Sequence, residues 1–288
     1  MAHRIARPRR PLAWLLAAAA LTLAALPARL TAQTPDQPNL IFTISGGIST
    51  GPSLWTLPRQ LAVVHTLFGA EWDSVTLGRS LVTGFTATLG ATYFRSPHLG
   101  YSFEVGFFGL DSQSSCRGLG PWVADSSHVN QYACQYLQGD INRGDAVGFL
   151  GGLMWRFTRG GTQPFVRAAI GPAILGSSYV EEEAPVILSN GGVEPVYFLA
   201  DQNHRELSWM ASLGAGVMLP LAPGYQLHVE VRDLLVSLPR PTGPATDTSL
   251  IAHDNVLPQP PTGMRLVQVP SITIGLDVVL EKKPGHRY

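Results

Sequence analysis

The feature that most constrains this chain is a strict alternation of apolar and polar residues, which recurs in seven segments of about ten residues each. In the clearest segment, Gly84 to Tyr93, Phe85 and Leu89 fall on one face, while Thr86 and Thr88 fall on the other. Successive side chains of a strand point to opposite faces, so each segment predicts a β-strand with one apolar and one polar face. Such strands, facing lipid outside and polar groups inside, are typical of a transmembrane β-barrel.

The alternation predicts an all-β fold, an eight-stranded antiparallel up-and-down transmembrane barrel with four long extracellular loops. The expected strands cover residues 39–50, 84–94, 100–110, 146–157, 163–175, 206–219, a seventh beginning at 225, and 271–280. Short connections at 95–98, 158–162 and 220–224 alternate with long ones at 51–82, 111–145, 176–205 and 237–268. In a bacterial outer-membrane barrel the short turns face the periplasm and the long loops face outside. A soluble sandwich has no reason to sort its connections in this way.

Residues 1–32 have the parts of a secretory signal peptide, which leaves 33–288 as the barrel domain. Four arginines between Arg4 and Arg10 form a cationic head, and an apolar run dominated by Ala and Leu follows from Leu12 to Leu26. This run is shorter than the ~20 residues that a transmembrane helix needs, and Pro27 closes it. We therefore expect cleavage near Gln33 and crossing of the membrane by strands.

The charge balance argues against a nucleic-acid partner. The chain holds 20 Lys plus Arg against 20 Asp plus Glu, and residues 1–32 contain five arginines and no acid. Removal of the signal leaves 15 basic and 20 acidic residues, so the mature chain is net negative. A negative protein is repelled by the phosphate backbone of a nucleic acid.

Cys116 and Cys134 are the only cysteines, and they share one polar segment. In an exported protein, two nearby cysteines predict a disulfide. A zinc site with His128 is the alternative, but it offers three obvious ligands at no recognised spacing. The remaining histidines also lack metal-like spacing, and no cofactor or metal site is expected.

Aromatic residues gather beside the three short turns, where they predict a girdle at the periplasmic interface. These residues are Tyr93, Phe94, Tyr101, Trp155, Phe157, Phe165 and Tyr225.

The strand pattern resembles the small eight-stranded outer-membrane barrels of the OmpA-like and OmpW-like superfamily, over nearly the whole mature chain. The resemblance rests on topology and general barrel patterning rather than on a signature motif. It implies insertion by the barrel-insertion machinery, which in family members commonly reads an aromatic residue at the end of the last strand. Here the expected last strand stops near Leu280, and a polar tail, 281–288, follows.

The inward faces are expected to carry three acids and three arginines, which predicts an ion-pair network that plugs the lumen. An eight-stranded barrel is only wide enough for side chains to fill it, and charges there must be paired. Gln226 is an additional candidate member. The predicted interior polar network comprises Glu104, Arg156, Arg167, His228, Glu230, Arg232 and Asp277.

The long loops carry three further expectations. The spacing of apolar residues from Leu61 to Phe68 allows a short amphipathic helix on the membrane or over the barrel mouth, although packing of loop one on neighbouring loops is the favoured interpretation. Glu181, Glu182 and Glu183 are expected to form a solvated patch, with divalent-cation bridging to lipopolysaccharide as the alternative. The prolines of 237–268 predict an extended, disordered loop.

These patterns predict a non-enzymatic outer-membrane protein that stabilises the envelope or presents surface loops. A narrow, porin-like channel or carrier for small hydrophobic compounds is the alternative. A lipid A-modifying enzyme is a further one, because His204 lies close to Glu206 and Ser208. The expected partners are outer-membrane lipids and lipopolysaccharide, with small hydrophobic molecules if the carrier alternative holds.

Overall fold

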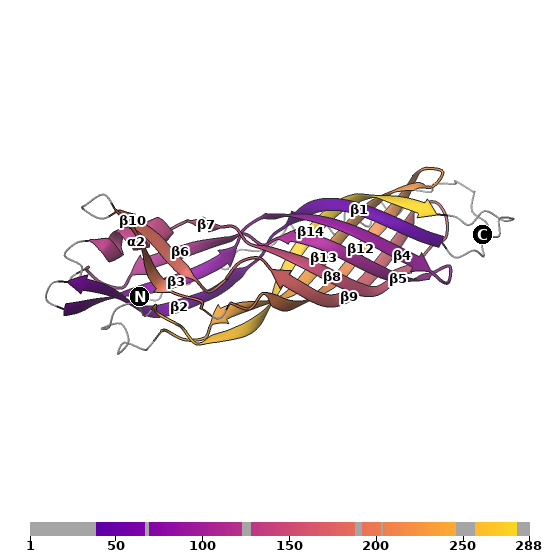
Figure 1. Ribbon diagram of the computed structural model, residues 1–288. Helices are drawn as coiled ribbons and strands as arrows, with labels where there is room; N and C mark the ends of the chain where they lie inside the picture. Colours follow the sequence, from indigo (N-terminus) through magenta and orange to yellow (C-terminus); the bar gives the residue numbers. More distant parts are fainter. Residues whose placement is uncertain are drawn as a thin grey trace, which may run out of the picture.

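The computed structural model describes residues 39–66, 69–122, 128–187, 192–202, 204–245 and 257–280. Eight strands close into an antiparallel barrel in the order β1-β14-β13-β12-β9-β8-β5-β4 (Figure 1). The predicted eight-stranded fold is thus confirmed, whereas the expected signal peptide at 1–32 and tail at 281–288 lie outside the described residues. The barrel strands are β1 (Asn39–Ser49), β4 (Gly84–Phe94), β5 (Leu99–Gly109), β8 (Asp145–Arg156), β9 (Gln163–Leu175), β12 (Leu207–Ala222), β13 (Tyr225–Pro241) and β14 (Thr262–Leu280).

The first and last barrel strands close the cylinder. β1 pairs with β14 from Leu40 opposite Leu280 to Ser49 opposite Ser271. The Thr50 N–H then donates to the Pro270 carbonyl oxygen at 3.0 Å. Because Pro270 has no N–H to donate to β1, the pairing between β1 and β14 ends there.

The outer wall of the barrel is apolar. Ile44, Leu89 and Ile274 are each about three-fifths exposed although they sit in the middle of paired strands. A closed barrel with such an exterior is suited to lipid rather than to water. Five of the predicted girdle aromatics, among them Trp155 and Tyr225, are exposed near the short turns.

The predicted girdle is wrong at two positions. Phe94 and Phe165 are each 1% exposed, and both point into the lumen. They occupy inward positions of β4 and β9, as the alternating burial of these strands shows. Phe94 and Phe165 therefore face the lumen although they lie beside turns, because the alternation of inward and outward side chains continues up to the turn.

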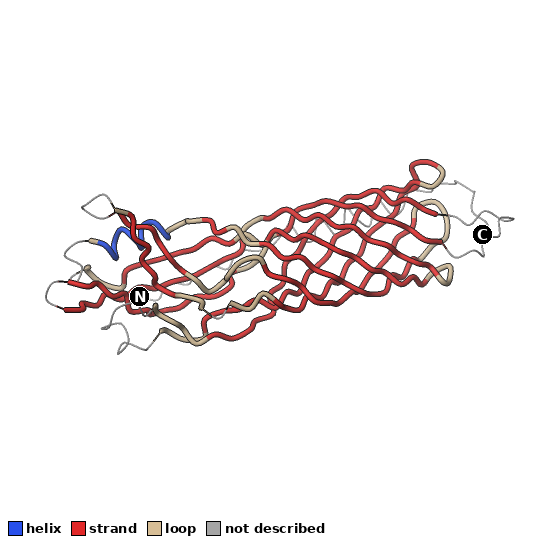
Figure 2. Tube along the Cα trace, viewed as in Figure 1, coloured by secondary structure: helices blue, strands red, loops and turns tan. Residues whose placement is uncertain are grey.

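The first three long connections fold into a cap beyond one end of the barrel (Figure 1). We call this the cap end and the opposite end, with the short turns, the turn end. The cap holds a four-stranded sheet, β2-β3-β6-β7, and a two-stranded sheet, β10-β11. Figure 2 shows that its described residues are mostly strand, together with the helix α2. Its elements are β2 (Ser53–Thr66), β3 (Gly69–Leu81), β6 (Ser112–Gly118), α2 (Val129–Leu137), β7 (Ile141–Asn142), β10 (Glu182–Ile187) and β11 (Val193–Leu199).

The amphipathic helix expected from Leu61 to Phe68 is wrong for Leu61 to Thr66, and 67–68 lie outside the described residues. The backbone there belongs to the antiparallel pair β2–β3, which contains register shifts between Ser53 and Trp55 and between Leu57 and Gln60. A bulge adds a residue to one strand and disrupts its alternation, so β2 does not show period two in the sequence. Packing of the first loop on its neighbours holds for the buried Trp55, whose indole N–H donates to the Tyr179 carbonyl oxygen.

β13 and β14 are longer than predicted and run beyond the barrel as a hairpin. β13 extends to Pro241, and β14 begins at Thr262, nine residues before the expected start. The Arg265 guanidinium donates to the Leu54 carbonyl oxygen at 2.7 Å, which joins the hairpin to β2 of the cap. The connection expected at 237–268 is therefore strand at its two ends, 237–241 and 262–268, and its central part, 246–256, lies outside the described residues.

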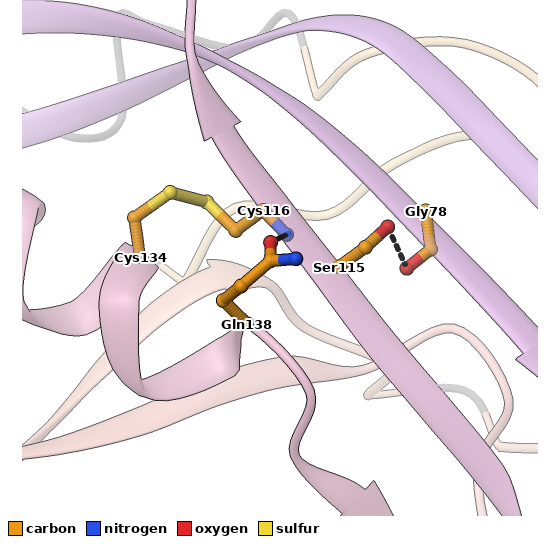
Figure 3. The surroundings of a disulfide bond; sticks show 5 residues. All are labelled: Gly78, Ser115, Cys116, Cys134 and Gln138. Carbon is orange, nitrogen blue, oxygen red and sulfur yellow. Dashed lines mark hydrogen bonds between the residues drawn. A yellow bond between two sulfur atoms is a disulfide. The ribbon is translucent and has the colours of Figure 1, made fainter.

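The predicted disulfide between Cys116 and Cys134 is confirmed (Figure 3). It joins β6 to α2, with a Cα–Cα distance of 5.2 Å. The Cys116 N–H also donates to the side-chain oxygen of Gln138, just after the helix. Because both sulfurs are bonded to each other, the zinc alternative at these cysteines is wrong.

Among the described residues, no helix is long and apolar enough to cross a membrane.

Candidate functional site in the barrel lumen

Two arginines and two glutamates form a closed ring of ion pairs across the lumen, which we call the ion ring. Arg167 donates to Glu104 at 2.7 Å and to Glu230 at 2.9 Å. Arg232 donates to the same two carboxylates, at 2.6 Å and 2.9 Å. All four side chains are buried. Each charge therefore faces opposite charges on two sides, which offsets the cost of removing it from water.

The strand order explains why these residues meet. Glu104 is on β5 and Glu230 on β13, which lie on opposite sides of the eight-stranded barrel, while Arg167 is on β9 midway between them. All four occupy inward positions of their strands. Because an eight-stranded barrel has an interior about one layer of side chains wide, long side chains from opposite walls reach each other.

His228 extends the ion ring towards the turn end. Its Nδ1 lies 3.2 Å from Asp277 Oδ2, and its Nε2 lies 3.3 Å from Glu230 Oε2. The Thr43 hydroxyl donates to the other oxygen of Asp277 at 2.6 Å. An imidazolium donates at both ring nitrogens, which suits a ring held between two carboxylates.

Arg156, expected in the same network, lies apart from it at the turn end. Its Nε donates to the Pro97 carbonyl oxygen at 2.6 Å, and its guanidinium carbon lies 4.0 Å from the ring centroid of Phe94. A second donor contacts the Gln163 side-chain oxygen at 3.3 Å. Alternation assigns Arg156 to the inward face correctly, but it does not give the height of a residue along the barrel axis.

A glycine makes room for the Glu230 carboxylate. A Cβ added at Gly214 would lie 2.0 Å from Glu230 Oε1, well inside van der Waals contact. Gly214 sits opposite Arg232 on the neighbouring strand, so a side chain there would displace the ion ring.

Apolar layers close the lumen on both sides of the charged groups. At the turn end, one buried cluster fills the barrel between the short turns and Asp277. It consists of Ile41, Phe94, Met154, Phe165, Met218 and Val279. At the cap end, inward residues such as Phe108, Leu150 and Leu234 belong to a second cluster, which continues without a break into the cap core around Trp55, Leu77 and Leu137.

A buried ion pair links β3 to β10 in the cap, and it was not predicted from the sequence. Arg79 on β3 donates to Glu182 on β10 at 3.0 Å, and both side chains are almost fully buried. The same guanidinium donates to the carbonyl oxygens of Ser178 and Glu181. Burial raises the pKa of Glu182, and the nearby Arg79 only partly offsets this. The expected solvated acidic patch is therefore wrong for Glu182, although Glu183 is exposed.

His204, a candidate for the enzyme alternative, contacts Asp201 rather than Ser208. The His204 Nδ1 lies 3.8 Å from Asp201 Oδ2, and the Ser178 hydroxyl donates to the same oxygen at 2.6 Å. The carboxylate thus lies between the hydroxyl and the imidazole. Activation of a serine needs the imidazole in that central place.

Comparisons with known proteins give likeness of shape at low sequence identity. No family model matches the chain, and no curated protein matches it. OprG of Pseudomonas aeruginosa is 12% identical, with 88% of this chain and 100% of that chain covered and a TM-score of 0.46. Neisserial surface protein A is 10% identical, covering 84% and 96%, with a TM-score of 0.37. Ail of Yersinia pestis is 12% identical, covering 85% and 99%, with a TM-score of 0.32.

The chain folds as a small, closed barrel of eight antiparallel strands with an apolar outer wall. Within the barrel, the buried charged network and the two apolar clusters that flank it form the candidate functional site.

Proposed function

We propose that the protein is a bacterial outer-membrane barrel with a closed lumen, which has no enzymatic activity and holds its cap at the cell surface in a structural or surface-interaction role. In this proposal residues 1–32 are removed during export, and the barrel-insertion machinery places the barrel. Outer-membrane lipids surround the apolar wall, and lipopolysaccharide borders the cap.

The observation that carries the proposal is the order of the three layers along the lumen. Passage of an ion requires continuous water, which an apolar constriction excludes. The ion ring lies between the turn-end cluster and the cap-end cluster, and both clusters fill the lumen with buried side chains. Arg156 and Gln163 are buried beside the turn-end cluster, so the cap-end cluster is the more strictly apolar of the two. Opening the ring would also separate buried ion pairs, which costs several kcal/mol.

The same arrangement disfavours the alternatives. A carrier of small hydrophobic compounds needs an axial path, but the inward positions towards the cap are occupied by fully buried side chains such as Phe108 and Leu234. A lipid-modifying enzyme needs an imidazole beside a nucleophile, and Asp201 separates Ser178 from His204.

Planar-bilayer recording tests the closed lumen. Purified full-length protein is expected to give no discrete conductance steps, while a general porin in the same membranes supplies the positive control. Reproducible single-channel steps from the purified protein would contradict the proposal and favour the channel alternative.

Labelling of intact cells tests the surface role. Leu119, Gly120 and Pro121 are exposed in the cap, and a Cβ at Gly120 would meet no other atom within 4 Å. An epitope inserted after Gly120 is expected to bind antibody on intact cells. An epitope in the turn at Gly160 should bind only after the outer membrane is permeabilised. The opposite labelling would contradict the proposed orientation.

A further inference from the structure

A shallow cavity lies on the outer wall of the barrel across β12, β13 and β14, and we call it the wall groove. Its volume is about 530 Å³, and the backbones of Gly214 and Arg232 also line it. The side chains that line it all belong to outward positions of their strands. They are those of Leu213, Ala215, Val231, Asp233, Gln268 and Pro270.

Asp233 is unusual because it places a carboxylate on this outward face. It sits opposite Leu213 on β12 and opposite Pro270 on β14. Val269 contributes one backbone hydrogen bond to the carboxylate, but Oδ1 is buried without a hydrogen-bond partner among the described residues. The neighbouring Arg232 points inward and donates to Glu104 and Glu230, so it does not neutralise Asp233.

Asp233 lies in the cap-side part of the apolar band. Tyr225 marks the turn-end girdle, and Asp233 lies eight residues farther along β13. At ~3.3 Å per residue and a tilt of about 40°, this spans roughly 20 Å of the ~25 Å apolar band. Leu213, Ala215 and Val231 line the groove together with Asp233. An acyl chain can therefore lie against the apolar residues while its headgroup reaches the carboxylate.

We propose that the wall groove binds an acyl lipid whose headgroup carries a primary ammonium. The Asp233 carboxylate is half-buried and pairs with no cation among the described residues, so it selects for positive charge. As a hydrogen-bond acceptor it also selects for an N–H donor. The apolar residues of the groove hold the chain by burial of hydrocarbon. The site lies outside the lumen, and its existence does not depend on whether the lumen conducts.

The test compares two lipids that differ in N–H donors. Palmitoyl lysophosphatidylethanolamine and palmitoyl lysophosphatidylcholine share chain, phosphate and net charge, but only the first has an ammonium that donates hydrogen bonds. Native mass spectrometry of the full-length protein, released from micelles holding equal amounts of both, counts the lipid retained. The protein is expected to retain the ethanolamine lipid roughly threefold more than the choline lipid.

Three variants locate the site. Asp233→Asn is expected to abolish the preference while keeping the groove. Ala215→Trp fills the groove and is expected to lower retention of both lipids. Ala87→Trp makes the same change on the outer wall of β4 and should leave retention and preference unchanged. Heat-modifiable gel migration verifies that each variant is a folded barrel.

Equal retention of the two lipids by the unaltered protein would overturn the proposal. So would an ethanolamine preference that survives in Asp233→Asn, or a loss in Ala87→Trp equal to that in Ala215→Trp. None of these outcomes bears on conductance, so failure here leaves the proposed closed lumen to its own test.

Discussion

Arg167 illustrates how strongly a single buried charge is constrained in this lumen. It contacts both glutamates of the ion ring and is almost fully buried. Removing one member of a buried network leaves its partners charged and away from water. Arg156 has the same side chain and also faces inward, but its donors contact neutral oxygens and an aromatic ring. Arg156 therefore serves as a control for Arg167, because it has the same side chain and faces inward but has no carboxylate partner.

Arg167→Met is expected to lower the free energy of unfolding by about 3–5 kcal/mol, because Glu104 and Glu230 lose a shared partner. Arg156→Met is expected to cost about 1–2 kcal/mol, because it removes only hydrogen bonds to neutral groups and one cation–π contact. Urea unfolding in lipid vesicles, followed by tryptophan fluorescence, measures both losses.

Adding Glu104→Gln to Arg167→Met provides the control for charge. The second change removes one of the uncompensated carboxylates, so part of the lost stability is expected to return. Equal losses for the two single variants, or no recovery in the double variant, would show that pairing in the ion ring does not set the cost.

At the scale of elements, strands that keep strict alternation could be predicted, and interrupted strands could not. β4 and β9 match their expected bounds, 84–94 and 163–175, because both alternate without interruption. β2 was missed because register shifts bring both Leu54 and Trp55 into the core. The outer part of β13 was read as loop because it contains Pro239 and Pro241, which are tolerated where a strand has a free edge.

The β10–β11 hairpin is expected to be less stable at higher pH because of Glu182. Burial raises the folded pKa of this carboxyl above its ordinary value of 4.5. Because the folded pKa is raised, protonated Glu182 favours the folded state, and this contribution to stability is fully present below about pH 4.5. It is lost as the pH rises through the folded pKa. Hydrogen exchange of the β10 and β11 amides, corrected for intrinsic rates, should show falling protection over that window.

Glu182→Gln is expected to abolish this pH dependence, because the amide does not ionise. Glu183→Gln, which changes an exposed neighbour on the same strand, should leave it intact. A pH dependence that persists in Glu182→Gln would assign the effect to another group.

For the whole molecule, the sequence predicts which residues face the lumen but not how they are layered. Alternation gave the inward face of Glu104, Arg167, Glu230 and Arg232 correctly. The height of each residue depends on strand tilt and register, which no local pattern encodes. For this reason Arg156 was grouped with charges that it does not reach, and the apolar layers at the two ends were not foreseen.

The layered lumen predicts that loss of the ion ring alone does not open the barrel. A variant that combines Glu104→Ala with Arg167→Ala is expected to give no conductance steps in planar bilayers, because both apolar layers remain. Steps in this variant, with none in the unaltered protein, would assign closure to the ion ring alone. Addition of Phe108→Ala and Phe165→Ala then tests whether thinning the apolar layers permits conduction.

The contact between β1 and β14 bears on how such a molecule is made. The two strands come from opposite ends of the described chain. All other neighbouring strands of the barrel can therefore form their hydrogen bonds before β1 and β14 meet. Until then each carries a row of peptide groups that hydrocarbon cannot satisfy. Closure of the barrel by β1 and β14 is thus the assembly step that leaves backbone groups unpaired for longest, and this pairing ends at Pro270.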